Sequence, residues 1–450
     1  MKRKEFLGTI VPGAIALKSA GIEKKPDPKG SGQSFSGLLA GRTLGGLRQK
    51  LHGELFDEFL PFWDKHGVDH ENGGFMCGID HDGTRVHSDK FHWFQGRGVW
   101  LYSFLFNHFG GDPRYLEIAR RTKDFMLAHF PQPDGGWAEL VARDGKVITP
   151  FRGDPFGMYF AAEGLYEYAH ATGDDASREI GVKLHKKLFA GMNRPDYRDQ
   201  GTGALGCRPQ GLWMANMQLS TQFLNRWQDP EISRIADQCV DAIIHRHWNP
   251  DLRLNNEILH FDFSRVEGEE MRSLIGHAIE CLWMVMDEAV RRNDQGLFTL
   301  AAERIRRHFE VGWDPVFGGI LQCVNVDQGC YEWPPEKPAG TTMEFRFRGE
   351  YQYVKSMWSM DEVLLSMIKV LEHIGTDWAA RYFTQTQQLV DEKYSLKPHG
   401  YPLWLTFADR RFTFQPHTMR KENYHKPRQL AFNILALDRM IQRGGPVWGQ

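Results

Sequence analysis

Gly110-Gly111-Asp112-Pro113 separates two stretches of helical periodicity, at about residues 91–109 and 113–130. An Asp before a helix can accept hydrogen bonds from its first free amides, and Pro fits the first helical position, which needs no amide proton. The short glycine turn therefore predicts a helical hairpin. Similar breaks recur at Thr172-Gly173-Asp174-Asp175, Gln228-Asp229-Pro230, Arg292-Asn293-Asp294 and Gly375-Thr376-Asp377. The fold is therefore predicted to be a repeat of helical pairs.

Helical periodicity extends over about twelve segments. They lie at about residues 38–65, 91–109, 113–130, 155–171, 175–192, 211–227, 230–248, 271–292, 295–311, 350–374, 376–394 and 424–442. Six helical pairs predict an all-α fold, an (α/α)6 barrel whose inner helices form the pocket wall and whose outer helices form the shell. A linear helical solenoid is the alternative, but solenoid repeats are usually shorter and more regular.

Short alternating segments follow three Gly-Gly pairs, Gly73-Gly74, Gly135-Gly136 and Gly318-Gly319. Asp82-Gly83 and Asp144-Gly145 supply turns of the kind that join paired strands. We therefore expect short β-hairpins on one rim of the barrel. The Gly-Gly pairs predict tight backbone rather than a phosphate site, because no GxxxxGK[ST] motif follows them.

The composition is that of a globular protein, with 41% hydrophobic and 25% charged residues. A formal net charge of -2 gives no reason to expect a nucleic acid or an anionic membrane as partner. Aromatic residues make up 13% of the chain, more than a plain helical core requires, which favours a cleft that binds rings such as sugars. No CxxC pair is present among the six cysteines, so the sequence indicates neither a zinc site nor a redox motif.

The N-terminus resembles an export signal. Residues 1–20 have a basic start followed by an apolar run that is too short to span a bilayer, and Arg3-Lys4-Glu5-Phe6-Leu7 is similar to a twin-arginine motif with Lys in the second basic place. Residues 21–36 are rich in Lys, Pro, Gly and Ser and predict a flexible linker. Residues 37–450 are then the single barrel domain. We expect an exported, periplasmic protein without stable membrane insertion; a cytoplasmic protein with a frayed tail is the alternative.

Ile275-Gly276-His277-Ala278-Ile279-Glu280-Cys281-Leu282-Trp283 begins a long apolar helix. At about 100° per residue, His277, Glu280 and Trp283 fall on one side of it. Imidazole titrates near neutral pH, a carboxylate one turn away can orient it, and an indole can stack on a sugar ring. A lone histidine on an apolar helix is, however, more often a hydrogen-bonded core residue.

Three other segments carry polar groups among aromatics. Arg97 follows Trp93-Phe94-Gln95-Gly96, although an Arg in such a place is more often a surface or ion-paired residue. Trp358 and Glu362 are one helical turn apart, which an ordinary packing helix would also explain. His425 opens the last helix, where the helix dipole favours its neutral form, and a simple capping role is the other interpretation.

Together these segments resemble the N-acylglucosamine 2-epimerase family, which includes cellobiose 2-epimerases and mannose isomerases. The segments that carry the resemblance are Trp93-Phe94-Gln95-Gly96-Arg97, Gly276-His277-Ala278-Ile279-Glu280, Trp358 with Glu362, and His425-Lys426-Pro427-Arg428. The resemblance covers most of the chain after residue 40. It implies an (α/α)6 barrel and a two-histidine mechanism at C2 of an opened reducing sugar, without a cofactor or a metal.

The resemblance also assigns roles to residues. His277 and His425 are the catalytic acid and base, and Arg97 binds the oxygens at C1 and C2. Trp283 and Trp358 form the sugar platform. We expect Glu280 to orient His277 and Glu362 to assist ring opening or to bind a hydroxyl. Arg428, in the last of the four segments, is a further substrate-binding candidate.

The segment Asn216-Met217-Gln218 departs from the pattern, since some relatives have a histidine after an Asn-Met pair. Gln218 can bind a sugar hydroxyl but cannot transfer a proton at neutral pH. The predicted activity is therefore a sugar 2-epimerase or an aldose-ketose isomerase, most similar to N-acylglucosamine 2-epimerases.

Two other classes remain open. A glycoside hydrolase of the same fold could use Glu280 and Glu362, but then His277 and His425 have no evident role. A non-catalytic member that binds a sugar or a protein is the second, because a fold does not determine function. The sequence leaves the oligomeric state open, a homodimer included.

Overall fold

The computed structural model describes residues 37–198, 205–267, 269–325, 329–330 and 354–448. The predicted export signal and linker lie outside these residues. The α-helices are α1 (Leu44–Gly53), α2 (Leu60–His66), α3 (His92–His108), α4 (Pro113–His129), α5 (Phe156–Thr172), α6 (Asp175–Met192), α7 (Gln210–Leu224), α8 (Pro230–Asp241), α9 (Ile275–Arg292), α10 (Gln295–Gly312), α12 (Met357–His373), α13 (Asp377–Leu389) and α14 (His425–Arg443). Helical turns of other types lie at Glu54–Phe59, Ala242–Arg246, Val390–Tyr394 and Lys397–His399.

The strands are short. They are β1 (Lys90–Phe91), β2 (Leu140–Val141), β3 (Val147–Thr149), β4 (Cys207–Pro209), β5 (Trp248–Asn249), β6 (Leu254–Asn255), β7 (Ile258–His260), β8 (Arg272–Leu274), β9 (Cys323–Asn325), β10 (Gly329–Cys330), β11 (Lys355–Ser356) and β12 (Phe407–Ala408). They pair in the orders β1-β2-β3, β10-β9-β8, β11-β12, β4-β7 and β5-β6. The helix expected from about residue 271 begins at Ile275, because the preceding residues pair as β8 with β9.

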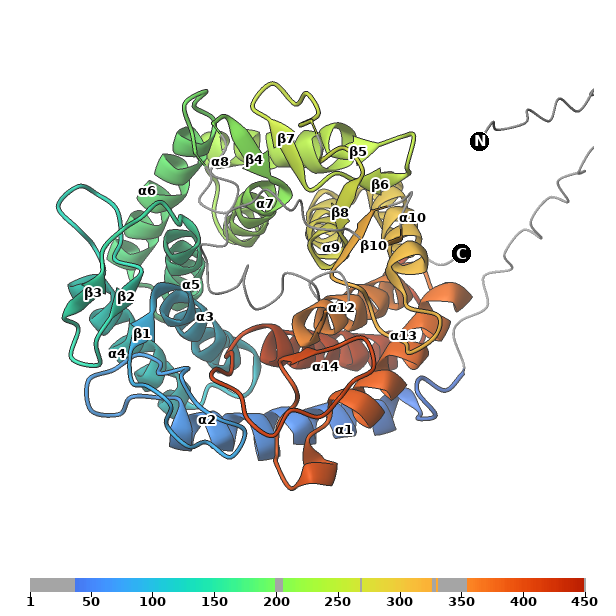
Figure 1. Cartoon of the computed structure of the whole chain (residues 1–450), viewed down its shortest axis with the longest axis horizontal. Coiled ribbons are helices and arrows are strands. Elements are labelled where there is room, and N and C mark those ends of the chain that lie inside the picture. Colours follow the sequence, from blue (N-terminus) through green and yellow to red (C-terminus); the bar gives the residue numbers. More distant parts are fainter. Residues whose placement is uncertain (1–36, 199–204, 268, 326–328, 331–353, 449–450) are drawn as a thin grey trace, which may run out of the picture.

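The long helices form two concentric rings (Figure 1). The inner ring runs α3, α5, α7, α9, α12 and α14, and α14 packs against α3 to close it. Helices α4, α6, α8, α10 and α13 each cover the inner helix that precedes them, and the N-terminal α1 covers α14. Inner helices are apolar around most of their circumference because they are covered on both sides. The predicted (α/α)6 barrel is confirmed.

The two ends of the barrel differ in their connections. Each of the first five inner helices passes to the following outer helix through one of the short turns that carry Asp, and four of these side chains accept hydrogen bonds from the first amides of the next helix. The return connections to the next inner helix are longer and contain the strands, so the predicted hairpins occupy one rim (Figure 1). The N-termini of the inner helices open on this rim. The four capping residues are Asp112, Asp174, Asp229 and Asp294.

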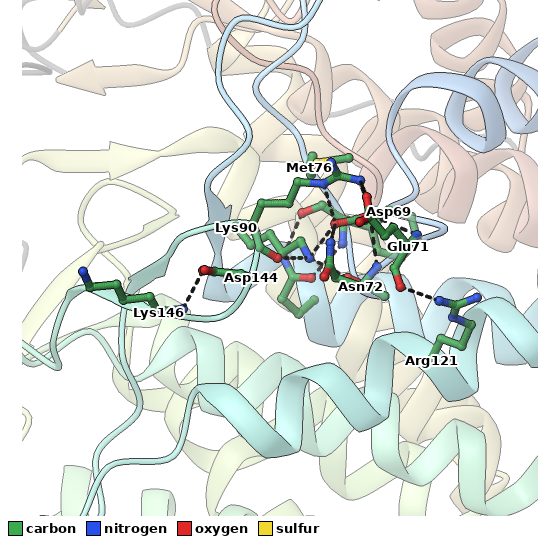
Figure 2. Close-up of polar contacts among 12 residues, drawn as sticks. Asp69, Glu71, Asn72, Met76, Lys90, Arg121, Asp144 and Lys146 are labelled. Atoms are coloured by element: carbon green, nitrogen blue, oxygen red, sulfur yellow. Dashed lines mark hydrogen bonds and ion pairs between the residues drawn. The ribbon is translucent and has the colours of Figure 1, made fainter.

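A buried lysine fixes the rim at the start of α3. The side chain of Lys90 is fully buried, and its ammonium group lies 2.9 Å from the carboxylate of Asp69 (Figure 2). The same group donates to the carbonyl oxygens of Gly73 at 2.7 Å and Arg143 at 2.8 Å, and Arg143 Nε donates to Asp69. These bonds join the Gly-Gly loop, the β2–β3 hairpin and the start of α3, and so fix the helix that carries Arg97.

The same arrangement recurs before α12. Lys355 is fully buried, lies 2.9 Å from the carboxylate of Asp314, and donates to the carbonyl oxygens of Gly318 and Arg410. Arg410 Nε donates to Asp314 at 3.0 Å. The repeat seen in the helical pairs therefore extends to the ion pairs that position two of the inner helices.

Gly73 offers a test of how tightly this rim is packed. Its φ is +83°, and a Cβ atom there would lie 2.5 Å from the carbonyl oxygen of Arg121. We expect Gly73→Ala to lower the free energy of unfolding by roughly 3 kcal/mol, because left-handed backbone and a backbone clash both add strain. Gly110 is the control, with φ +86° and no atom within 4 Å of its Cβ position, so Gly110→Ala should cost only about 1 kcal/mol. Equal losses in urea unfolding curves would contradict the clash.

None of the helices in the described part of the chain is both long and apolar enough to cross a bilayer.

Candidate active site

Two of the predicted residues lie at the starts of α9 and α14, the inner helices on either side of α12, on the hairpin rim. His277 is the third residue of α9, and His425 is the first residue of α14. Trp358, the second residue of α12, lies in ring contact with both, at centroid distances of 5.4 Å to His277 and 5.7 Å to His425. The structure therefore brings the predicted histidines and one predicted tryptophan together from segments that lie far apart in the sequence.

The carboxylate that orients His277 is Glu257, and the prediction that Glu280 does so is wrong. His277 Nδ1 lies 3.0 Å from Glu257 Oε1, whereas Glu280 points to another partner. Glu257 directly precedes β7 and is held there by two backbone hydrogen bonds. Burial lowers the pKa of His277, but the charge and hydrogen bond of Glu257 outweigh it, so that the pKa lies above its ordinary value.

His425 is oriented by Glu422, three residues earlier. Its Nδ1 lies 2.7 Å from Glu422 Oε1 and 2.9 Å from Oε2. Burial lowers the pKa of His425 below its ordinary value in spite of this carboxylate, while His425 and Arg97 hold the pKa of Glu422 at about 2. The two histidines therefore differ in the direction of their pKa shifts, which is upward for His277 and downward for His425.

Both imidazoles present the same atom to a substrate. An ionised carboxylate can only accept hydrogen bonds, so Nδ1 of His277 and Nδ1 of His425 must each be the donor. Nε2 is then the atom that can take or give a proton. A neutral His425 can act as a base through Nε2, and a protonated His277 can act as an acid through Nε2.

Arg97 lies in the second turn of α3, with its guanidinium group among aromatic rings. The guanidinium carbon is 3.8 Å from the ring centroid of Phe160 and 4.5 Å from that of Tyr424. The side chain is buried, and its Nε has no hydrogen-bond partner among the described residues. Burial lowers the pKa of Arg97, but a guanidinium group stays charged at neutral pH. A buried cation with a free donor is suited to bind an oxygen that becomes negatively charged.

A second layer lies about one helical turn below the histidines. Arg428 is fully buried, and its Nη2 donates to Glu280 at 2.7 Å and to Glu362 at 2.6 Å. The structure thus brings three predicted substrate-binding residues together, but in contact with one another. Ligand atoms of Glu280, Glu362 and His425 lie within 4.8 Å of each other, close enough for a cation to bridge them. Arg428 already supplies a positive charge to both carboxylates.

Gln218 joins the same layer from α7. Its side-chain amide donates to the hydroxyl oxygen of Tyr424 at 2.9 Å and to the carboxylate of Glu163. The Tyr424 hydroxyl donates to Glu163 at 2.5 Å and accepts from Arg428 at 3.1 Å. The amide group of Gln218 is therefore already engaged, and its expected contact with a sugar hydroxyl stays a prediction.

Trp283 is not in ring contact with the histidines within the described structure, and its assignment to the sugar platform is wrong. Its indole is 2% exposed, and its N–H donates to Glu362 Oε2 at 2.6 Å. Six residues separate it from His277, which corresponds to about 9 Å along a helix axis. Its ring instead lines a cavity at the other end of the barrel.

Sequence reasoning missed the two carboxylates that orient the histidines. Glu422 precedes His425 by three residues, so the local spacing could have indicated it. Glu257 follows Asn255-Asn256 in a strand connection 20 residues before His277, and no spacing rule links the two.

Comparison with known proteins gives the same fold and one family. The sequence profile described as N-acylglucosamine 2-epimerase (GlcNAc 2-epimerase) matches residues 73–426. The N-acylglucosamine 2-epimerase of Rattus norvegicus is 24% identical over 428 residues, which cover 90% of this chain and 95% of the rat protein. The cellobiose 2-epimerase of Bacteroides fragilis is 21% identical over 390 residues, covering 81% and 92%. The structure of cellobiose 2-epimerase from Bacillus thermoamylovorans has a TM-score of 0.72 at 16% identity, over 87% of this chain and 99% of that one.

Proposed function

Because the chain belongs to the N-acylglucosamine 2-epimerase family, we propose that it inverts C2 of a ring-opened reducing sugar by proton transfer between two histidines. Family membership makes it a sugar isomerase, a 2-epimerase in type. The observation that carries the proposed mechanism is the pair His277 and His425, each held by a carboxylate and both in ring contact with Trp358. An N-acylglucosamine is the proposed substrate, supported by the forms of the segments around Arg97 and His425.

The opposite pKa shifts of the histidines define one direction of the reaction. Neutral His425 removes the proton from C2 through Nε2, and the electrons of the C–H bond move toward the C1 carbonyl to give an enolate, which is an enediolate in sugars with a hydroxyl group at C2. Protonated His277 then donates its Nε2 proton to the other face of C2. After one turnover the protonation states are exchanged, so the reverse direction or a proton exchange with solvent restores the starting enzyme.

Arg97 supplies the charge that this intermediate needs. A carbon acid beside a carbonyl is far less acidic than an imidazolium, so the enolate forms only if the negative charge on its C1 oxygen is stabilised. The buried guanidinium, with a donor that is free among the described residues, is the proposed partner of the oxygen at C1, and also of the oxygen at C2 in sugars that carry one there. Trp358 is the proposed surface for the sugar, because it touches both imidazoles.

The proposal is tested by proton exchange at C2. The enzyme is incubated in D2O with N-acetylglucosamine, N-acetylmannosamine, mannose, glucose and cellobiose, and the C2 proton is followed by NMR. Epimerisation predicts deuterium at C2 and a second set of anomeric signals. Aldose-ketose isomerisation would add deuterium at C1 and give a ketose. A sugar that binds without exchange or conversion throughout this panel contradicts the proposal.

The geometry argues against a glycoside hydrolase that uses Glu280 and Glu362. Both side chains are buried and share the guanidinium group of Arg428. Carboxyl groups that cleave a glycoside must flank the bond and reach its oxygen or anomeric carbon. Glu280 and Glu362 are bound to a buried cation beneath the histidines, so they could reach a glycosidic bond only if their contacts with Arg428 were broken.

The pH dependence of kcat/KM gives a sharper test. In the direction in which His425 is the base and His277 the acid, activity is lost as pH falls through the lowered pKa of His425 and as pH rises through the raised pKa of His277. Glu257→Gln removes the charge that raises the pKa of His277, so the alkaline limb should move to lower pH, with a loss of about tenfold in kcat/KM at neutral pH.

Two controls separate this effect from general damage. Glu422→Gln removes the carboxylate beside the other histidine, so it should move the acidic limb and leave the alkaline limb in place. Glu303→Gln, on the outer helix α10, should leave both limbs unchanged. An alkaline limb that stays in place in Glu257→Gln would show that Glu257 does not control His277.

The sequence of the N-terminus supports a separate proposal, that residues 1–20 direct export to the periplasm. Changing Arg3 and Lys4 to Gln removes the basic start, so the full chain should remain in the cytoplasmic fraction of a Gram-negative host. The unchanged chain should be found in the periplasmic fraction. The same distribution for both forms would contradict an export signal that needs these residues.

A further inference from the structure

A second cavity lies at the opposite end of the barrel from His277 and His425. It has a volume of about 340 Å³ and is lined by residues from the middle and C-terminal parts of the six inner helices and from the end of α7 onward. Trp283, Glu167 and Lys369 are among them, each later in its helix than the residues of the polar layer. The layer of Arg428 and Gln218 therefore separates this cavity from the histidines.

One wall of the cavity is aromatic. Trp100 and Phe104 from α3 stack at a centroid distance of 5.0 Å, and Phe432 from α14 lies 5.2 Å from Phe104. Trp283 from α9 meets Phe432 edge to face at 6.4 Å. The four rings come from three helices and leave only part of their apolar surface open to the cavity, since Trp283 is 2% and Trp100 3% exposed. Such surface stacks on the apolar face of a sugar or of another ring.

Polar side chains also line the cavity, and their charges are paired; Lys369 Nζ lies 5.2 Å from the ring centroid of Trp283 and 5.1 Å from that of Phe432. Lys369 Nζ lies 2.5 Å from Asp287, and Arg226 Nη2 lies 3.1 Å from Glu167. Gln222 donates to Glu167 at 3.0 Å, while its buried Oε1 has no partner among the described residues. A charged ligand would have to break an existing ion pair to gain a partner. Hydroxyl groups both donate and accept, so they can bind beside such pairs without separating them.

The cavity is in hydrogen-bond contact with the catalytic layers. Trp283 lines it and donates to Glu362, which shares Arg428 with Glu280. Gln218 also lines it and donates to Tyr424, whose ring lies against Arg97. A ligand that shifts Trp283 or Gln218 therefore changes the hydrogen bonds of the layer beneath the histidines or the position of Tyr424 against Arg97. Any such coupling is reciprocal, so a sugar in the active site would also change affinity at the cavity.

We propose that this cavity is a second, non-catalytic binding site for a neutral sugar, and that its occupation changes turnover at the histidines. The binding site itself is independent of the proposed epimerase activity, whereas its effect on turnover depends on that activity. Methyl N-acetyl-β-glucosaminide is a suitable probe because its ring cannot open, so it cannot undergo exchange at C2. Glucose 6-phosphate tests the preference for a neutral ligand.

The experiment combines calorimetry with turnover. In the unchanged enzyme, the methyl glycoside should bind at millimolar concentration and change kcat for the reducing sugar at least twofold, an effect that simple competition cannot produce. Leu435→Trp, at a half-buried position of the cavity wall, should weaken this binding at least tenfold and abolish the change in kcat. Ile441→Trp, at an exposed position of the same helix, is the matched control and should bind as the unchanged enzyme does.

Three results would overturn the inference. They are a purely competitive effect on KM, equal binding in Leu435→Trp and Ile441→Trp, and tighter binding of glucose 6-phosphate than of the neutral glycoside. Thermal unfolding of both variants verifies that they are folded. If the unchanged enzyme exchanged no C2 proton of any reducing sugar in D2O, that result would count against the proposed function alone. The methyl glycoside reports binding at the cavity without proton transfer at C2.

Discussion

Replacing either His277 or His425 with asparagine is expected to lower kcat for epimerisation by about 10²- to 10⁴-fold, the usual contribution of a positioned acid or base. Asparagine keeps a polar group of similar size but cannot transfer a proton at neutral pH. Each histidine lies at the start of a different inner helix and bonds to one carboxylate there. Because only local contacts are lost, neither change should unfold the barrel. The measurement is the initial rate of epimer formation from each side.

The exchange of C2 hydrogen gives a more specific expectation for the same variants. If the two histidines serve opposite faces of C2, the single remaining base can still remove and return the proton on its own face. His425→Asn should then exchange C2 hydrogen of one epimer without inversion, and His277→Asn should do so for the other epimer. Exchange of both epimers in either variant would show that one histidine reaches both faces, which contradicts the division of roles.

Arg428→Met is expected to have the largest effect on stability, lowering the free energy of unfolding by roughly 3–5 kcal/mol. Arg428 is the buried cation that Glu280 and Glu362 share, so its removal leaves the Glu280 carboxylate without a counter-charge beside Glu362, whose pKa burial already raises to about 8. The same change should lower kcat, because Glu280 and Glu362 lie one turn below His277 and Trp358. Urea unfolding at several pH values measures the first effect.

The pH dependence of this loss follows from the two carboxylates. In the unchanged protein, burial already raises the pKa of Glu362 to about 8, whereas Arg428 and the nearby histidines hold the pKa of Glu280 below its ordinary value against the effect of burial. Without the guanidinium group, burial and mutual repulsion raise the pKa of Glu280 as well, and that of Glu362 further, in the folded variant. Their protonated forms fold without penalty at low pH, and the penalty grows as pH rises through the raised pKa values. The gap between Arg428→Met and the unchanged protein should therefore widen from pH 5 to pH 8. Adding Glu280→Gln should restore part of the stability, and a loss below about 1 kcal/mol at pH 8 would contradict the role of the pair.

The position of Trp283 illustrates what helical periodicity can and cannot predict. The 100° rotation per residue correctly places His277, Glu280 and Trp283 toward the barrel interior. It says nothing about depth, and the 1.5 Å rise per residue puts the three residues in three different layers. His277 lies at the rim, Glu280 in the layer of Arg428, and Trp283 at the far cavity. Residues on one face of a helix that lines a deep barrel can therefore belong to different sites.

The hydrogen-bond partners of the buried polar residues could not be predicted from the sequence either. Glu280 is closer to His277 in sequence than Glu257, yet Arg428 takes Glu280 and the strand connection before β7 delivers Glu257. Such choices depend on which side chains from separate elements compete for one another in a buried space. Hydrogen-bond partners across 20 or 148 residues leave no local signal in the chain.

The sequence alone determined the repeat of helical pairs, because capping Asp residues and glycine turns act within a few residues of themselves. It also indicated the rim of strands and the two histidines, whose chemistry and position at helix starts are local properties. The tertiary structure decided which carboxylate holds each histidine, which residues touch a substrate and which lie below it, and that a second cavity exists. These features arise only when six inner helices meet at one axis, since burial and pairing depend on distances between segments far apart in the chain.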